Sequence, residues 1–302
     1  MPKDTSIEDE CSISKTWRTG RISSGAPGTY MSPAHTNFKV DGRQDVSRNQ
    51  IRERQPRFLL MWNEILNIFS HLIGSVLFFA LPIPVYYSLQ PRYGTATTAD
   101  VVVFSTFFFG VAICFALSAT FHVFNNHSES IHVFGNQLDY LGIVILMWGS
   151  TIPCVHYGFY CTQRLQTTYY TLVSVLAAGC VYATLHPAFR RPKYRPYRAA
   201  MYSGLGLSFI IPIVHGLLKF GWETQMWRMS LDWMALMTAF NLTGGALYAM
   251  RIPEKWYPYR FDIWGSSHQI MHCLVVCAGI AHLFGLLRAF DHVHGYGNVC
   301  MT

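Results

Sequence analysis

The chain has 302 residues, of which 51% are hydrophobic and only 13% are charged, and its formal net charge is +7. A soluble domain carries about 25% charged residues and needs polar faces on its surface helices, so this composition excludes an ordinary soluble fold. Basic loops that face anionic lipid account for the positive charge. We therefore expect no nucleic-acid partner.

Residues 1–57 differ from the rest of the chain. They are rich in Ser, Thr, Pro, Gly and Asn, with scattered charges and no sustained apolar period. Such a composition buries too little apolar surface to offset the entropy lost on ordering. We predict a disordered tail without a cleavable signal peptide, because no charged segment leads into a short apolar one. The first apolar segment, residues 65–89, would serve as the signal anchor.

Seven apolar stretches without Asp, Glu, Lys or Arg follow this tail. A membrane-spanning helix needs about 20 predominantly apolar residues, and each stretch has 18 or more. The sequence predicts an all-α, polytopic membrane protein with a seven-helix domain over residues 58–290 and a short extracytoplasmic tail over 291–302. The stretches are Ile65–Pro91, Val101–Ser128, Tyr140–Gln163, Leu165–Phe189, Ala199–Leu218, Trp233–Met250 and Ile263–Leu287.

The basic residues predict the orientation of these spans. Lys and Arg are concentrated before the first span and in the loops 190–198 and 251–260. Cytoplasmic loops carry such an excess, so we predict a cytoplasmic N-terminus and an outer C-terminus, the reverse of a G-protein-coupled receptor. The last span has no lysine, which excludes a retinal Schiff base. Cys161 and Cys300 would both lie near the outer face and could form a disulfide, although nothing in the sequence requires it.

With this orientation, polar residues from distant segments fall in one layer near the cytoplasmic face. His122 ends the second span, Asp139 opens the third, and His268 and His272 begin the last. The i, i+4 spacing places the last two imidazoles on one helix face. Three imidazoles with an open position are typical of catalytic zinc, so we predict Zn²⁺ on His122, His268 and His272, with activation of a water.

Other polar residues near this layer have supporting roles in the prediction. Asp139 could orient a ligating imidazole or act as a base, and Ser118, one turn before His122, could hold a water or a substrate oxygen. The polar residues of the first span are interpreted mainly as interhelical hydrogen-bonding groups: Glu64, Asn67 and His71. His282 lies about 15 Å beyond His272 and is too far away to share the ion.

The remaining histidines are not predicted to be metal ligands. We interpret three of them as packing residues within the spans: His156, His186 and His215. The pair His292 and His294, in the motif DHVHG, is interpreted as exposed and without a metal.

Five motifs resemble a known family. They are NEILNIFSHLIG (63–74), SATFH (118–122), LDYLGI (138–143), ALYAMRIPEKWYP (246–258) and FDIWGSSHQIMHCLVVCAGIAH (261–282). Over residues 50–287 the chain is similar to the adiponectin and progestin receptor family, which is related to hemolysin III, and to its adiponectin-receptor branch in particular. The segment NNHSESIHVFGN (125–136) departs from that family's pattern.

The resemblance implies more than the spacing of residues can. It implies seven helices with a cytoplasmic N-terminus, zinc on His122, His268 and His272, and Asp139 linked through water. Family members are receptors for adiponectin or steroids, or act in zinc and sterol homeostasis, and related proteins hydrolyse ceramide. The implied partner is a membrane lipid, ceramide or sterol-like. An extracellular ligand stays unidentified. The plasma membrane is favoured, with an endomembrane as the alternative.

Three functions stay open at this point. The first is a receptor-type protein of lipid metabolism with zinc-dependent lipid amide hydrolase chemistry, in which Asp139 shuttles a proton. The second is a non-catalytic receptor or sensor in zinc or sterol homeostasis with a structural zinc. The third and least favoured is a zinc transporter, because the chain lacks paired Gly/Pro-interrupted segments of the inverted-repeat kind.

Overall fold

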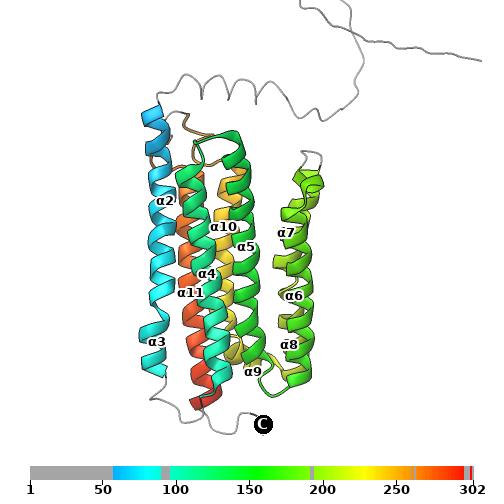
Figure 1. Ribbon diagram of the computed structural model, residues 1–302. Coiled ribbons are helices and arrows are strands. Elements are labelled where there is room, and N and C mark those ends of the chain that lie inside the picture. The colour runs from blue at the N-terminus through cyan, green and yellow to red at the C-terminus, as the bar shows by residue number, and fades with distance from the viewer. Residues whose placement is uncertain are drawn as a thin grey trace, which may run out of the picture. The chain divides into compact units, whose positions relative to one another are not determined.

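A computed structural model describes residues 57–89, 96–190, 194–258, 260–261, 263–295 and 300. The predicted tail over residues 1–57 lies outside this part of the chain except for Arg57, where α2 begins. Helices account for most of the described residues (Figure 1). Their bounds are α2 Arg57–Ala80, α3 Pro82–Leu89, α4 Thr98–Phe124, α5 Glu129–Gly158, α6 Gln163–Leu185, η1 Pro187–Arg190, α7 Arg195–Leu207, α8 Ile210–Phe220, α9 Trp222–Arg228, α10 Leu231–Met250 and α11 Ser267–Gly295.

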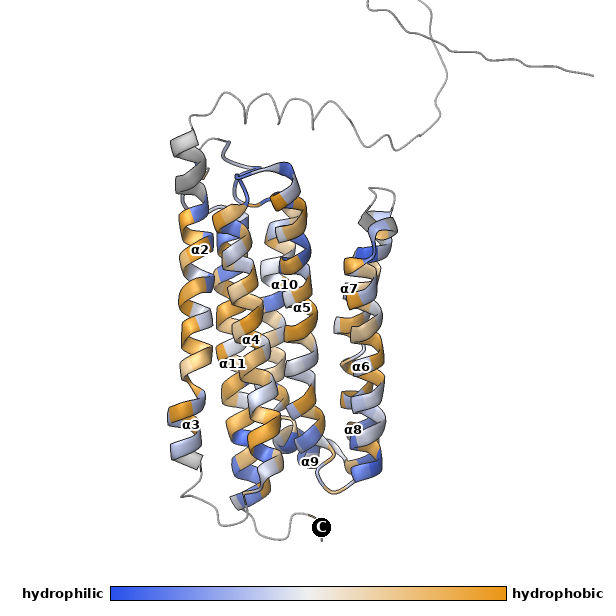
Figure 2. Cartoon of the chain, in the orientation of Figure 1, coloured by the Kyte–Doolittle hydropathy of each residue, from blue (hydrophilic) through white to orange (hydrophobic). Residues whose placement is uncertain are grey.

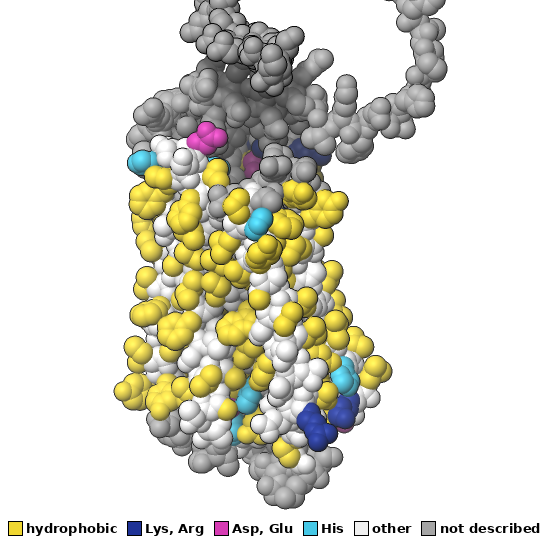
Figure 3. Space-filling model, turned by 45° about the vertical axis from the view of Figure 1, so that its right-hand side comes forward, with side chains coloured by type: hydrophobic (Ala, Val, Ile, Leu, Met, Phe, Trp, Pro, Cys, Tyr) yellow, Lys and Arg dark blue, Asp and Glu magenta, His cyan; other side chains and the backbone are white. Residues whose placement is uncertain are grey.

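The described residues confirm the predicted all-α membrane fold. They contain no strand, and six segments are long and apolar enough to cross a membrane: Glu64–Tyr87, Thr98–Phe124, Glu129–Gly158, Gln163–Leu185, Ala200–Phe220 and Ser267–Gly295. The seventh helix, α10, has 20 residues. It is less apolar than the six segments because it contains Asp232 in its first turn and Asn241 near its middle. Apolar residues cover the sides of the helices (Figure 2), and on the face in Figure 3 the charged side chains lie only toward the two ends.

Two predicted spans are interrupted helices, and proline explains both interruptions. Pro82 ends α2 and opens α3, and it cannot donate a backbone hydrogen bond to the carbonyl of Phe78. Pro212 likewise cannot donate a hydrogen bond to the carbonyl of Ser208. The helix is interrupted there, since α7 ends at Leu207 and α8 begins at Ile210. Each pair of consecutive helices, α2 with α3 and α7 with α8, still forms one continuous apolar segment.

Helices α4 and α5 pack closely because glycine lies between them. A Cβ atom on Gly149 would stand 2.4 Å from the backbone oxygen of Thr106, and one on Gly142 would stand 2.9 Å from the Cα of Cys114. Small residues let backbones approach in this way in membrane helices. The core around this contact contains the fully buried Phe107 and Phe115. The closely packed pair α4–α5 therefore holds the residues at its two ends in fixed positions.

Helix α11 starts later and ends later than the predicted last span. It runs from Ser267 to Gly295, so the motif DHVHG forms its last turn. A disulfide joins Cys161, in the turn after α5, to Cys300, with 5.3 Å between their Cα atoms. The pairing that the sequence left open is therefore present in the structure.

Candidate metal centre

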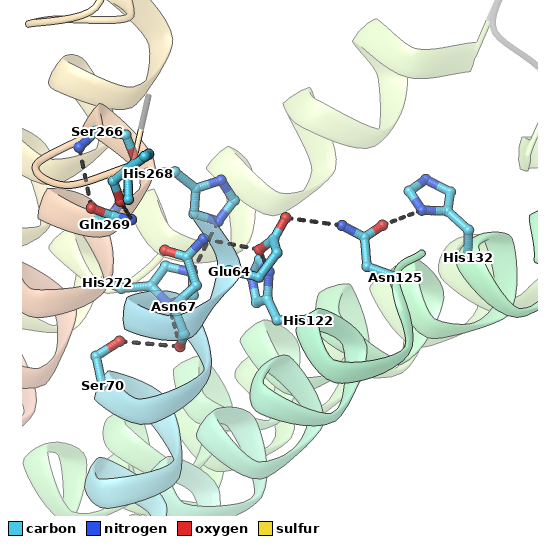
Figure 4. A network of polar contacts seen from close by, with 11 residues as sticks. Glu64, Asn67, Ser70, His122, Asn125, His132, Ser266, His268, Gln269 and His272 are labelled. Atoms are coloured by element: carbon cyan, nitrogen blue, oxygen red, sulfur yellow. Dashed lines mark hydrogen bonds and ion pairs between the residues drawn. The ribbon is translucent and has the colours of Figure 1, made fainter. Parts of the chain in front are cut away.

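Three histidines from two helices meet at the end of the bundle where α2 begins. His122 lies in the last turn of α4, and His268 and His272 lie in the first turns of α11, as predicted. Each offers one ring nitrogen, and these atoms lie within 4.8 Å of one another. The ring centroids are 5.1 Å apart for His122 and His268, and 4.9 Å apart for His122 and His272. Figure 4 shows the rings converging.

The donor atoms face one another in a way that suits a metal ion. The Nε2 atoms of His268 and His272 are 2.9 Å apart. Two nitrogen ligands at about 2.0–2.1 Å from a tetrahedral Zn²⁺ lie about 3.3 Å apart, so a small side-chain adjustment accommodates an ion. The Nε2 atom of His122 is buried and has no hydrogen-bond partner in the described part of the chain. A buried nitrogen without a partner is costly, and a cation would remove that cost.

Hydrogen bonds at the opposite ring nitrogens fix the tautomers of two of these histidines. His122 Nδ1 lies 2.7 Å from the carboxylate of Glu64. A carboxylate only accepts, so Nδ1 carries the proton and Nε2 keeps its lone pair. His272 Nδ1 lies 3.3 Å from the backbone oxygen of Asn67, with the same consequence. Both imidazoles are held in the form that binds metal through Nε2.

The turn before α11 holds the two histidines of that helix in place. Gln269, which is 1% exposed, accepts hydrogen bonds from the backbone N–H groups of Gly265 and Ser266 and donates to the backbone oxygen of Ile263. Gly265 has φ +77°, a left-handed conformation that glycine adopts without strain. This turn explains why the helix starts at Ser267 and why its first turns present His268 and His272.

Asp139 does not open its helix as predicted. Helix α5 begins at Glu129, because Ser128 caps it by accepting a hydrogen bond from the N–H of Ile131. Asp139 therefore lies almost three turns into α5. Its carboxylate forms a hydrogen bond with the side chain of Ser118 and interacts electrostatically with His122. The structure thus brings Asp139 and Ser118 together beside one of the three histidines.

The residues of α2 have sharper roles than the sequence indicated. Glu64 forms the interhelical contact expected of it and occupies the orienting position beside His122 for which the sequence offered Asp139. The side chain of Asn67 donates to Glu64 within α2, and only its backbone oxygen contacts another helix, at His272. His71 differs from expectation, because its ring stacks on those of His272 and Phe115 with centroid separations of 3.7 and 4.6 Å. Its ring nitrogens have no hydrogen-bond partner among the described residues. Glu64, Asn67 and His71 are spaced i, i+3, i+7, which places them on one face of α2. This spacing, together with their position in the same layer as the three histidines, could have indicated that the face contacts the metal centre.

Three further histidines of α11 lie away from this centre: His282, His292 and His294. His282 contacts the sulfur atoms of Met237 and Cys154, and so takes no part in the cluster, as predicted. His292 stacks on Trp227. His294 is buried and lies 3.1 Å from Asp100, which corrects its interpretation as an exposed tail residue.

A second polar cluster surrounds Asp100 at the opposite end of α4. One carboxylate oxygen accepts a 2.9 Å hydrogen bond from the Tyr157 hydroxyl and lies 3.1 Å from His294 Nε2. The other accepts from the backbone N–H and the hydroxyl of Thr97, both at 2.8 Å. His156 Nε2 is 3.8 Å from the carboxylate. This cluster could not be predicted from the sequence, since its members lie in separate segments without a common motif.

Comparisons with known proteins agree with the geometry. The profile of the Haemolysin-III related family matches residues 60–283. The chain belongs to this family. It is 39% identical over 220 residues to the adiponectin receptor protein of Drosophila melanogaster, which covers 73% of this chain and 49% of that one. The progestin and adipoQ receptor-like protein 1 of Caenorhabditis elegans is also 39% identical over 220 residues, 73% of this chain and 50% of the relative.

A yeast member of the Haemolysin-III related family is covered more fully. The ADIPOR-like receptor IZH2 of Saccharomyces cerevisiae is 38% identical over 232 residues, 77% of this chain and 73% of the relative. The chain spans about half the length of the fly and nematode relatives. The resemblance to the adiponectin-receptor type is confirmed, and the matched region contains every residue of the candidate metal centre.

Proposed function

We propose that this chain is an adiponectin-receptor-type membrane protein of lipid metabolism that binds Zn²⁺ and hydrolyses an amide-linked membrane lipid such as ceramide. The observation that supports the proposal best is the convergence of His122, His268 and His272, whose ligand atoms lie within 4.8 Å of one another. The names of the relatives, which call them adiponectin or adipoQ receptors, support the receptor part.

Zinc fits the chemistry of these donors. All three are imidazoles, and two of them have the Nδ1 proton committed to an oxygen, so that Nε2 is free to bind. Imidazole suits zinc among the available divalent metals. A zinc ion held by three protein ligands polarises a carbonyl oxygen and lowers the pKa of water, which is the chemistry that amide hydrolysis requires.

The protein's own groups would handle the proton. Asp139 is the carboxylate beside His122 that does not already serve as its hydrogen-bond acceptor. In the proposed reaction it takes a proton from the attacking water and returns it to the leaving amine. Ser118, which is 3% exposed, lies within reach of the same carboxylate and would orient it or a substrate oxygen. The substrate's acyl chain would enter from the lipid between helices.

The test joins metal content to lipid turnover in the same samples. The purified wild type should contain about one zinc per chain and release fatty acid from ceramide. Asp139→Asn should retain zinc and lose turnover by about 100-fold or more, the usual contribution of a general acid–base group. His186→Ala, at the end of α6 and outside the site, is the control. Zinc-loaded wild type that binds ceramide but releases no fatty acid would refute the hydrolase.

A non-catalytic receptor or sensor in zinc or sterol homeostasis is the second candidate. It is favoured by the way the centre ties three helices together: α4 and α11 provide the donors, and α2 binds two of them through Glu64 and Asn67. If zinc only braces these helices, His122→Ala should lower the melting temperature and leave any lipid turnover unchanged. If zinc is catalytic, the same variant should abolish turnover.

The orientation and the compartment are also proposed. We infer that the N-terminus is cytoplasmic, from the distribution of basic residues. The disulfide Cys161–Cys300 supports this, because disulfides persist outside the cytoplasm and this one lies at the other end of α5 from the metal centre. A thiol reagent that cannot cross membranes should label neither cysteine in intact cells until an external reductant is added. We favour the plasma membrane, and the ligand on its outer side is unidentified.

A further inference from the structure

The turn between α4 and α5 is bonded to the metal centre. It belongs to the segment 125–136. Asn125 follows directly after α4, and its amide nitrogen lies 3.2 Å from Glu64 Oε1. Its amide oxygen lies 2.5 Å from Nδ1 of His132, in the first turn of α5. Figure 4 shows a continuous chain of contacts from His122 through Glu64 and Asn125 to His132.

The donors and acceptors of this chain have only one consistent arrangement. Glu64 as a carboxylate can only accept, so both His122 Nδ1 and Asn125 Nδ2 donate to it. The amide oxygen of Asn125 is then left to accept from His132 Nδ1. Each group thus fixes the next one, and the fixed end is the Nε2 atom of His122 that faces the other two histidines.

Burial makes Glu64 depend on these donors. The side chain of His122 is 2% exposed and that of Glu64 is 17% exposed. A carboxylate with so little water around it needs protein donors, and it has three: His122, Asn125 and Asn67. Asn125 and His132 are only half-buried, so the chain extends from a buried imidazole to the surface of the α4–α5 turn.

We propose that Glu64, Asn125 and His132 are positioning residues that set the metal affinity of His122 from the α4–α5 turn. The inference rests on the proposed binding of a divalent metal and is independent of whether lipid is hydrolysed. It gives the segment 125–132 a role that its exposure alone does not indicate. A change in this turn alters the orientation and basicity of a metal ligand without touching the metal.

The loss of metal affinity caused by a substitution should decrease with the distance of the substituted residue from His122 along the chain of contacts. Partners of ligating histidines typically contribute about 10–100-fold in affinity. Glu64→Gln keeps the size but loses the charge, and it should raise the Kd for zinc by about that much. Asn125→Ala should raise the Kd by several-fold. His132→Ala should have the smallest effect of the three.

The experiment is a competition between the full-length protein in detergent and a chromophoric zinc chelator. His127→Ala is the matched control, because this exposed histidine lies in the same turn and the only hydrogen bond that the structure gives it is through its backbone N–H. Melting in a metal chelator separates a loss of folding from a loss of binding, and the variants should melt like the wild type there. Glu64→Gln combined with Asn125→Ala should cost less affinity than the two single effects together, since both act through His122.

A spectroscopic measurement completes the test. Bound Co²⁺ should show an altered visible spectrum in Glu64→Gln and in Asn125→Ala, and an unaltered one in His127→Ala. If wild type binds zinc and the Glu64 and Asn125 variants match the control in affinity and spectrum, the positioning role is refuted while the metal site stands. If wild type binds no divalent metal, the metal site fails, and the positioning role with it.

Discussion

The two ends of helix α4 carry two buried polar clusters built on opposite principles. At the His122 end, ring nitrogens of three imidazoles face one another, and Nε2 of His122 has no hydrogen-bond partner among the described residues. At the Asp100 end, a carboxylate lies between an imidazole, a tyrosine hydroxyl and a threonine, so donors and acceptor satisfy one another. The comparison shows that buried histidine alone does not indicate a metal. What matters is whether the ring nitrogen that faces the cluster has a hydrogen-bond partner there or keeps a lone pair that can bind a cation.

The largest contrast should appear on removing one histidine from each cluster. His272→Ala removes a donor from the metal centre and should lower zinc affinity by more than about 100-fold, because losing even an outer partner costs about 10–100-fold. His294→Ala should leave the zinc content at the wild-type level. Elemental analysis of both purified variants measures this. Equal loss of zinc from both would erase the distinction between the clusters.

Removing the carboxylate of the second cluster should affect stability instead. Asp100→Ala removes the acceptor of the buried Tyr157 hydroxyl, and an unsatisfied buried group costs about 1–3 kcal/mol. We expect lower thermal stability, equally with and without metal, and unchanged zinc content. Melting followed by tryptophan fluorescence in detergent, with and without chelator, is the measurement. A loss confined to the metal-loaded protein would mean that the two ends are coupled.

A substitution between the two clusters tests the closely packed pair α4–α5 that separates them. Gly149→Ala should destabilise the fold by about 1–3 kcal/mol, because its Cβ would stand 2.4 Å from the backbone oxygen of Thr106. Gly179→Ala on α6 is the matched control, since nothing lies within 4 Å of its Cβ position. The same melting assay applies, and equal melting of the two variants would contradict the close packing of α4 on α5.

The smallest effect is expected at His292, two residues before His294. It stacks on Trp227 with ring centroids 6.1 Å apart, and such ring pairs are worth about 0.5–1.5 kcal/mol. His292→Ala should therefore change stability by at most about 1.5 kcal/mol and leave the zinc content unchanged. A melting shift as large as that of Asp100→Ala would contradict this expectation and show that His292 belongs to the cluster.

Much of the fold follows from the sequence, because a membrane-spanning helix requires about 20 predominantly apolar residues and can be recognised from them. The apolar stretches predicted the seven helical segments and the converging histidines. The breaks at Pro82 and Ser208 depend on single prolines inside otherwise apolar runs, and the late start of α11 depends on Gln269 bonding to the turn before it. Such details arise from individual backbone hydrogen bonds, which hydropathy does not detect.

The metal centre was predictable in part for a similar reason. The depth of a residue in the membrane follows from its place in a span, so the layer containing His122, His268 and His272 could be read from the sequence. The direction of a side chain around its helix axis could not. The sequence therefore could not show that Glu64, and not Asp139, bonds to His122. The partners of Asp100 come from the end of α5, the end of α11 and the residue before α4, and they share no motif.

The central claim is that three imidazoles from α4 and α11 bind one zinc ion. X-ray absorption at the zinc edge of the purified wild-type protein tests it most directly. We expect one zinc per chain with nitrogen neighbours at about 2.0–2.1 Å and the scattering pattern of imidazole. A protein without zinc, or sulfur neighbours at about 2.3 Å from cysteines such as Cys273 and Cys277, would contradict it.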